Sequence, residues 1–251
     1  MHDIAIIGSG VAIGLVFGLF GAGGSAFATP VLNLLGVPGV MAVASPLPAM
    51  IPAAVAGARR HIRAGNLDRA TARWSIAGGV PGAVLGSLLS VALDGRRLLI
   101  LSGLILLAVG LRILLPDPAG TCARGVRRRH EPSLVVGAAF IVGLLTGVLA
   151  NGGGFLLVPL YVLAFGLGTA EAAGTSMVAV AALAVPTLVT HIVLGHIDWP
   201  VAAAFAAGLV PGSSAGSALA ARLPAVLARR AFGCLLVAFA VWFLMTKMWG
   251  A

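Results

Sequence analysis

A chain of 251 residues that is 60% hydrophobic and 9% charged, with a mean hydropathy of +1.09, has too few charges to coat a soluble globule. Ordinary soluble domains carry roughly 25% charged residues. The composition excludes that class and predicts a membrane protein. About 20 apolar helical residues cross the hydrocarbon core, and several stretches reach that length.

The net charge of +9 lies in short loops between apolar runs. The positive-inside rule produces this placement, whereas a nucleic-acid partner would need a basic helix face or tail. Cys122 and Cys234 lack metal-ligand spacing, so we expect neither a metal site nor a structural disulfide. Residues 1–3 lack a basic region and a cleavage site, and we expect the first apolar run to be retained.

In chain order, the first apolar run spans residues 4–36 and is interrupted by glycines. As one helix it would reach about 50 Å, too long for one crossing, while two full crossings need about 40 residues. We therefore predict a helical hairpin or discontinuous helix broken at Gly21 to Gly24. Three ordinary spans follow, at 41–58, 74–93 and 98–115.

The second half has the same order. A basic linker with Arg124 and Arg127 to Arg129 is predicted at 116–132, and a second broken run covers 133–166. The remaining spans are predicted at 172–194, 199–220 and 231–249. The chain therefore divides into a first repeat, 1–115, the linker, and a second repeat, 133–251.

The two halves repeat each other about 130 positions apart, which is the first feature to look for in a biased sequence. Glycines alone would align by chance in such a chain, but histidine, aspartate and proline in one register indicate a duplication. The pairs are Gly14 with Gly143, Gly18 with Gly147, His61 with His191, Gly65 with Gly195, Asp68 with Asp198, and Pro81-Gly82 with Pro211-Gly212.

Basic residues distinguish two topologies. If each broken run turns back, only Arg96, Arg97 and Lys247 fall on the minority side; if each crosses once, five arginines do. The positive-inside rule favours the first arrangement. The prediction is an all-α polytopic membrane protein of two inverted repeats, each a glycine-broken helical hairpin plus three transmembrane helices. The linker is then cytoplasmic and both termini lie on the other side.

The glycine clusters mark the candidate substrate site. Backbone N–H groups freed by a break inside a membrane must face protein, water or a ligand, and a short helix beginning there presents partial positive charge to an anion. The alternative is close helix packing, which is our interpretation of the ladders at 78–86 and 208–216. The candidate substrate-binding residues are Gly21, Gly23, Gly24, Ser25, Asn151, Gly152, Gly153 and Gly154.

Polar residues beyond the breaks supply further candidates. Ser45, Thr175 and Ser176 open the next span of each half, where hydroxyls either bind an anion or cap helices. His61 and His191 are proton-coupling candidates because histidine titrates near neutrality, with an interfacial turn role as the alternative. Glu171 is a third such candidate, and a solvated loop position is its alternative.

No cofactor, metal or enzyme activity is predicted. Gly21 to Ala26 fits G-x-G-x-x-A, but no strand–helix–strand unit follows and no acid occurs between Asp3 and Asp68 to hold a ribose. No glycine cluster precedes the Lys-Ser/Thr of a phosphate-binding loop, and no Ser/His/Asp set has catalytic spacing.

The duplicated pattern resembles the sulfite exporter TauE/SafE family, also called the 4-toluene sulfonate uptake permease family. The resemblance covers nearly the whole chain. It rests on Phe20-Gly-Ala-Gly-Gly24, Asn151-Gly-Gly-Gly-Phe155, Gly174-Thr-Ser-Met177 and the two His-x-x-x-Gly-x-Ile/Leu-Asp turns.

This resemblance implies a secondary transporter of the cell inner membrane. It would hold a small sulfur-containing anion, such as sulfite, sulfoacetate or another organosulfonate, at a midplane site between the hairpins and release it by alternating access. An anion channel on the same scaffold is the alternative, and a structural membrane partner without substrate is a weaker one. A homodimer is a further option for the assembly.

Overall fold

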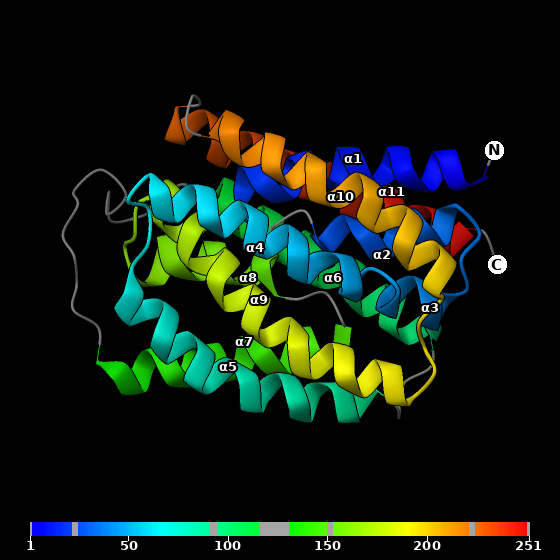
Figure 1. Ribbon diagram of the computed structural model, residues 1–251, viewed down its shortest axis with the longest axis horizontal. Helices are drawn as coiled ribbons and strands as arrows, with labels where there is room; N and C mark the ends of the chain where they lie inside the picture. Colours follow the sequence, from blue (N-terminus) through cyan, green and yellow to red (C-terminus); the bar gives the residue numbers. More distant parts are fainter. Residues whose placement is uncertain are drawn as a thin grey trace.

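The computed structural model describes residues 2–21, 25–90, 95–115, 131–149, 153–220 and 224–249, and the regular elements in these ranges are helical. They lie side by side in one bundle (Figure 1). The first half forms α1 (His2–Phe20), α2 (Ser25–Leu34), α3 (Gly39–Ala44), α4 (Leu47–Arg63), α5 (Arg69–Ser90) and α6 (Gly95–Leu114). The second forms α7 (Pro132–Leu149), α8 (Gly154–Pro159), the π-helical turn η1 (Leu160–Ala164), α9 (Thr169–Val193), α10 (Trp199–Ala220) and α11 (Ala225–Trp249).

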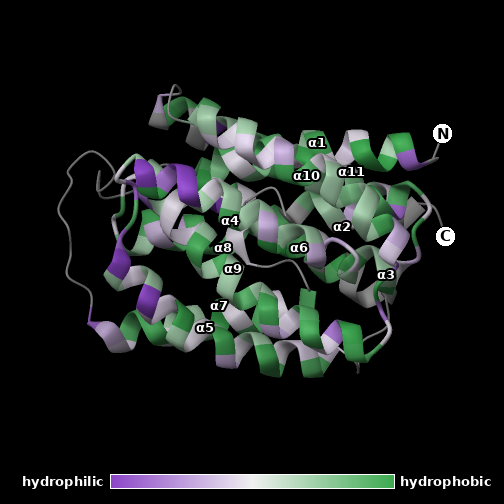
Figure 2. Cartoon of the chain, viewed as in Figure 1, coloured by the Kyte–Doolittle hydropathy of each residue, from purple (hydrophilic) through white to green (hydrophobic). Residues whose placement is uncertain are grey.

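Apolar side chains cover the outside of this bundle as well as its interior. Leu88 and Val193 are 57% and 80% exposed, an arrangement that lipid favours and water does not. Hydrophilic residues gather where α4 ends and α5 begins (Figure 2). The prediction of an all-α, multi-pass membrane protein is confirmed. In the described residues, the helical stretches long and apolar enough to cross a membrane are Asp3–Phe20, Gly39–Arg63, Pro132–Leu149, Thr169–Val193 and Trp199–Ala220.

Both long apolar runs break at the predicted glycines. The first run ends one helix at Phe20 and begins the next at Ser25, and the second does so at Leu149 and Gly154. Pro159 closes α8 and leads into the wider turn η1. The helices beyond the breaks are too short to span a bilayer, as expected for a hairpin with one long and one short arm.

The repeated His-x-x-x-Gly-x-x-Asp turns explain where the next helices begin. Gly65 and Gly195 have φ of 75° and 68°, values that glycine adopts without a Cβ penalty, and they end α4 and α9. The Asp68 carboxylate accepts the N–H groups of Ala70 and Thr71 at 2.9 and 3.1 Å and so caps α5. Asp198 caps α10 in the same way.

The halves exchange their first helices. Helix α1 packs along α10 of the second half, and α7 packs along α5 of the first, at opposite edges of the bundle (Figure 1). Glycines line both contacts and bring the backbones together: a Cβ on Gly82 would collide with the carbonyl of Phe140, and one on Gly212 would lie 2.6 Å from the carbonyl of Val11. The packing interpretation of the two glycine ladders is therefore confirmed.

Helices α4 and α9 lie between these edges and run antiparallel. The Asp68 N–H, just beyond the end of α4, donates to Thr175 Oγ1 near the start of α9 at 3.0 Å. The Asp198 N–H, just beyond the end of α9, donates to Ser45 Oγ at the start of α4, also at 3.0 Å. In each half, a hydroxyl therefore accepts a hydrogen bond from the aspartate turn of the other half. The helices differ at Pro46, which lacks an N–H and interrupts the path from α3 to α4, whereas α9 is continuous.

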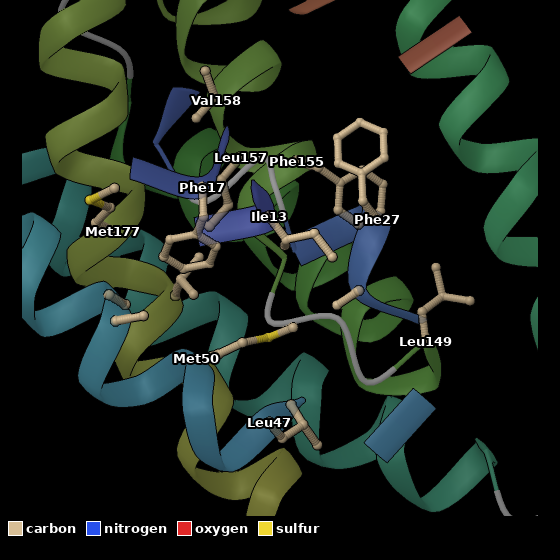
Figure 3. Close-up of a cluster of buried hydrophobic side chains, with 14 of the residues drawn as sticks. Ile13, Phe17, Phe27, Leu47, Met50, Leu149, Phe155, Leu157, Val158 and Met177 are labelled. Atoms are coloured by element: carbon tan, nitrogen blue, oxygen red, sulfur yellow. The ribbon is translucent and has the colours of Figure 1, made fainter. Parts of the chain in front are cut away.

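The two hairpins meet through buried apolar side chains. Phe17 from α1, Phe27 from α2, and Phe155 and Leu157 from α8 belong to one core cluster, and Met50 of α4 completes it (Figure 3). All five are at most 4% exposed. This packing places residues of both hairpins in one buried core with α4 and α9.

The glycine contacts predict a position-dependent response to one methyl group. Gly82→Ala should lower the free energy of unfolding by at least about 1–3 kcal/mol, because the new Cβ meets immobile backbone. Gly137→Ala on the partner helix α7 is the control, since no atom lies within 4 Å of its added Cβ. Thermal unfolding of the purified proteins in detergent measures both. Equal melting temperatures for the two variants would contradict the close packing.

Candidate substrate site

The first helix break is docked on the second half. Gly21 has φ of 71°, and an added Cβ would strike the Cα of Ala173 in α9. The Ser176 hydroxyl lies 2.8 Å from the Gly21 carbonyl and 2.9 Å from that of Ala173. Gly21 and Ser176, two predicted site residues 155 positions apart, are therefore in direct contact.

The second break is shaped by α7 itself. Gly153 has φ of 82°, and a Cβ there would lie 2.7 Å from Thr146 Cγ2. The Gly153 carbonyl accepts the N–H groups of Leu156 and Leu157, both at 3.0 Å, and so starts α8. Gly154 is the first residue of that helix. Gly23, Gly24, Asn151 and Gly152 lie outside the described residues, and Ser25 is described only as the first residue of α2.

The hydroxyls of Ser45 and Thr175 are buried and already accept a hydrogen bond. Each is 0% exposed and caps the turn of the opposite half. This contact matches the capping alternative. A hydroxyl that accepts an N–H still has its own proton to donate. Their role as substrate ligands therefore stays a prediction.

His61 and His191 occupy equivalent places in different surroundings. Both are buried, with 4% and 1% exposed, and the Nε2 of each has no partner among the described residues. His61 forms a hydrogen bond to the backbone of Gly18 at the end of α1. His191 Nδ1 instead lies 3.1 Å from His196 Nδ1, so a second histidine neighbours it at its end of the bundle. Glu171 lies in the first turn of α9.

Two cavities adjoin His61. The inner one, of about 90 Å³, is lined by Phe20 at the first helix break and by Pro159 at the end of α8, and has mostly apolar walls. The outer one, of about 540 Å³, is lined by Arg60, Arg63 and Asn66, among others. His61, Ala170 and Ala220 line both. The two cavities are therefore neighbours, and together they extend from the basic end of the bundle to the first helix break.

Sequence reasoning used Arg60 and Arg63 only to orient the chain and did not consider Asn66 or Ser217 for the site. One signal was available: arginines three positions apart lie on one helix face, next to a histidine that already was a candidate. Ser217 offered no comparable signal, because its cavity-lining position depends on α10 packing against α1 and α4 of the other half.

The fold and the cavities define a multi-pass helical membrane protein with a basic entrance and glycine-broken hairpins at its centre. The family model of the sulfite exporter TauE/SafE matches residues 6–243, and the chain belongs to this family. It is a membrane transporter, which implies a small-molecule substrate and a lipid bilayer around the helices.

Relatives agree with this assignment. A "Probable membrane transporter protein" of Xylella fastidiosa (strain 9a5c) is 32% identical over 99% of this chain and 97% of its own length. "Probable membrane transporter protein YunE" of Bacillus subtilis (strain 168) is 24% identical over 89% of each chain. The search of solved structures gave no match. The names describe membrane transporters, and they support the prediction that the chain is not an enzyme.

Substitutions of Thr175 distinguish a structural role of its hydroxyl from a role in binding substrate. Thr175→Val should lower the free energy of unfolding by about 1–3 kcal/mol, because the Asp68 N–H loses its acceptor. Thr175→Ser keeps the oxygen and should resemble the wild type. Thr187→Val is the matched control, since that hydroxyl bonds only within its own helix. Thermal unfolding measures all three; unchanged stability of Thr175→Val with lost anion binding would instead favour the ligand role.

Proposed function

We propose that this protein is a secondary transporter that moves small sulfur-containing anions, namely sulfite, sulfoacetate or related organosulfonates, by alternating access. The observation that carries the proposal is the pair of neighbouring cavities that share His61 and extend from the basic end of the bundle to the first helix break. A hydrated anion can enter from that end. The apolar walls of the inner cavity and the buried apolar cluster that contains residues of both hairpins oppose a continuous aqueous pore.

The substrate would bind where the helix breaks expose backbone N–H groups. The glycines of both clusters, with Ser25, Asn151 and the hydroxyls of Ser45, Thr175 and Ser176, are the proposed ligands. Helix α2 and the α8–η1 segment begin at the breaks, so their N-terminal N–H groups and partial positive charge would face an anion. Gly21 and Ser176 support this arrangement because they belong to different halves and already touch.

The halves would act as inverted repeats. The antiparallel course of α4 and α9 supports this, as does the reciprocal exchange of first helices. In Figure 1, α1 starts at the end of the bundle that carries the N-terminus, and α7 starts at the opposite end. This topology would put the linker in the cytoplasm and both termini outside it, in the cell inner membrane. A homodimer stays a proposal for the assembly.

Alternating access would exchange the environments of the two histidine turns. At the His61 end the outer cavity is open. At the other end His191 meets His196, and Ser87 Oγ lies 3.3 Å from Thr190 Oγ1, which ties α5 to α9. Movement of one half against the other would open this second end and close the first. Because the two halves have similar sequences, each could adopt the arrangement that the other has in this structure.

Transport is tested with purified protein in liposomes. Saturable uptake of labelled sulfite or sulfoacetate, accelerated by unlabelled anion inside, is the expected result. Gly21→Ala should reduce exchange at least about tenfold, since its Cβ collides with α9 at a positive φ. Gly36→Ala is the control, because Gly36 also has positive φ but open space around it. Ohmic current without saturation would overturn the transporter in favour of the channel.

Proton coupling is tested by imposing a pH gradient on the same liposomes. His61→Gln should remove the acceleration of net uptake by the gradient, because His61 stands between the two cavities, yet should spare exchange at equal pH. Glu171→Gln and His191→Gln are measured in parallel to find which candidate carries the proton. If all three variants respond to the gradient like the wild type, these residues do not couple protons to transport.

A further inference from the structure

We propose that the outer cavity at the end of α4 is itself a binding site for a small oxyanion, separate from the helix breaks. The site consists of Arg60, Arg63 and Asn66, with Ser217 of α10 and His61 of α4 also in its lining. It would capture an anion from the aqueous phase before the anion reaches the hairpins. This proposal rests on the proposed function only for the choice of sulfite as the probe; the site itself is argued from the lining of the cavity.

The chemistry of the lining favours an anion. Two guanidinium groups supply donors in a planar fork that matches an oxyanion, and Asn66 and Ser217 add neutral donors. The remaining lining residues, in the part of the chain that the structure describes, are alanines, so no carboxylate is among them. The volume of about 540 Å³ admits an anion with its first waters, since one water occupies about 30 Å³ of liquid.

The positions of Arg60 and Arg63 distinguish the cavity from a merely basic surface. Arg60 and Arg63 are three residues apart and therefore share a face of the last turn of α4. The neighbouring Arg59 and Arg69 are exposed at the same end of the bundle but do not line the cavity. All four arginines contribute positive charge to this end of the bundle, but only Arg60 and Arg63 line the cavity.

His61 lines the cavity and carries a buried polar atom without a partner. The side chain is 4% exposed and its Nε2 has no hydrogen-bond partner among the described residues, so this nitrogen lies behind the cavity wall rather than in the open space. The same side chain borders the inner cavity, so an anion or its hydration water beside it would lie at the entrance to the inner space.

Equilibrium binding tests this site without requiring turnover. Full-length protein is placed in nanodiscs of phosphatidylcholine and titrated with ³⁵S-labelled sulfite at low salt. The double variant R60Q/R63Q should raise the Kd roughly tenfold or more, and R60K/R63K should recover much of the affinity because it keeps the charge. The matched control R59Q/R69Q removes the same charge from the same end and should bind like the wild type.

A second arm identifies the source of the oxyanion. Adding phosphatidylglycerol to the discs should leave sulfite binding unchanged if the site takes a soluble ion, whereas competition that is equally strong in the wild type and in R59Q/R69Q assigns the same chemistry to a lipid phosphate. Equal loss of affinity in both glutamine double variants, or no loss in either, overturns the site. If the variants bind sulfite in the predicted order but the protein does not transport it, the proposed function is wrong and the binding site is still supported.

Discussion

The close backbone contact between α1 and α10, and between α7 and α5, is the constraint on which the rest of the structure depends. In lipid the hydrophobic effect does not drive helices together, so association comes from packing and from hydrogen bonds between helices. Glycines at 78–86 and 208–216 allow that packing because they place one backbone against another. The exchange leaves α4 and α9 in the middle, where the Ser45 and Thr175 hydroxyls tie each turn to the opposite half.

The proposed transport path follows the boundary between the two halves that this exchange creates. The break at Gly21 rests on Ala173 and Ser176 of the other half, and His61 separates a basic entrance from an apolar chamber. Most buried polar groups have partners, and the exceptions in the described residues are Asn33 Oδ1, Ser75 Oγ, the Tyr161 hydroxyl and the Nε2 atoms of His61 and His191. The two histidines lie at opposite ends of the central helix pair, where His61 lines a cavity and His191 contacts His196.

The sequence predicted the helical class, the duplication and the breaks because each depends on local composition or on spacing. Gly65, Asp68 and their counterparts marked turns whose caps the structure contains. Which helix each glycine ladder meets was not predictable, because small-residue ladders fit many partners and the contacts join residues far apart in the chain. For the same reason, the position of Ser217 was not predictable. The choice between a capping and a ligand role for Ser45 was also open, because it depends on where Asp198 lies.

The exchange of first helices also governs the order in which the chain can assemble during synthesis. The ladder on α5 is complete by Ser90, but its partner α7 begins only at Pro132, and α1 must wait for α10, which begins at Trp199. The N-terminal half therefore leaves the ribosome with both of its glycine surfaces uncovered. Helix α5 gains its partner when α7 follows in the middle third of the chain, and α1 gains its partner only when the last third arrives. A truncated first half would lack its natural partners altogether.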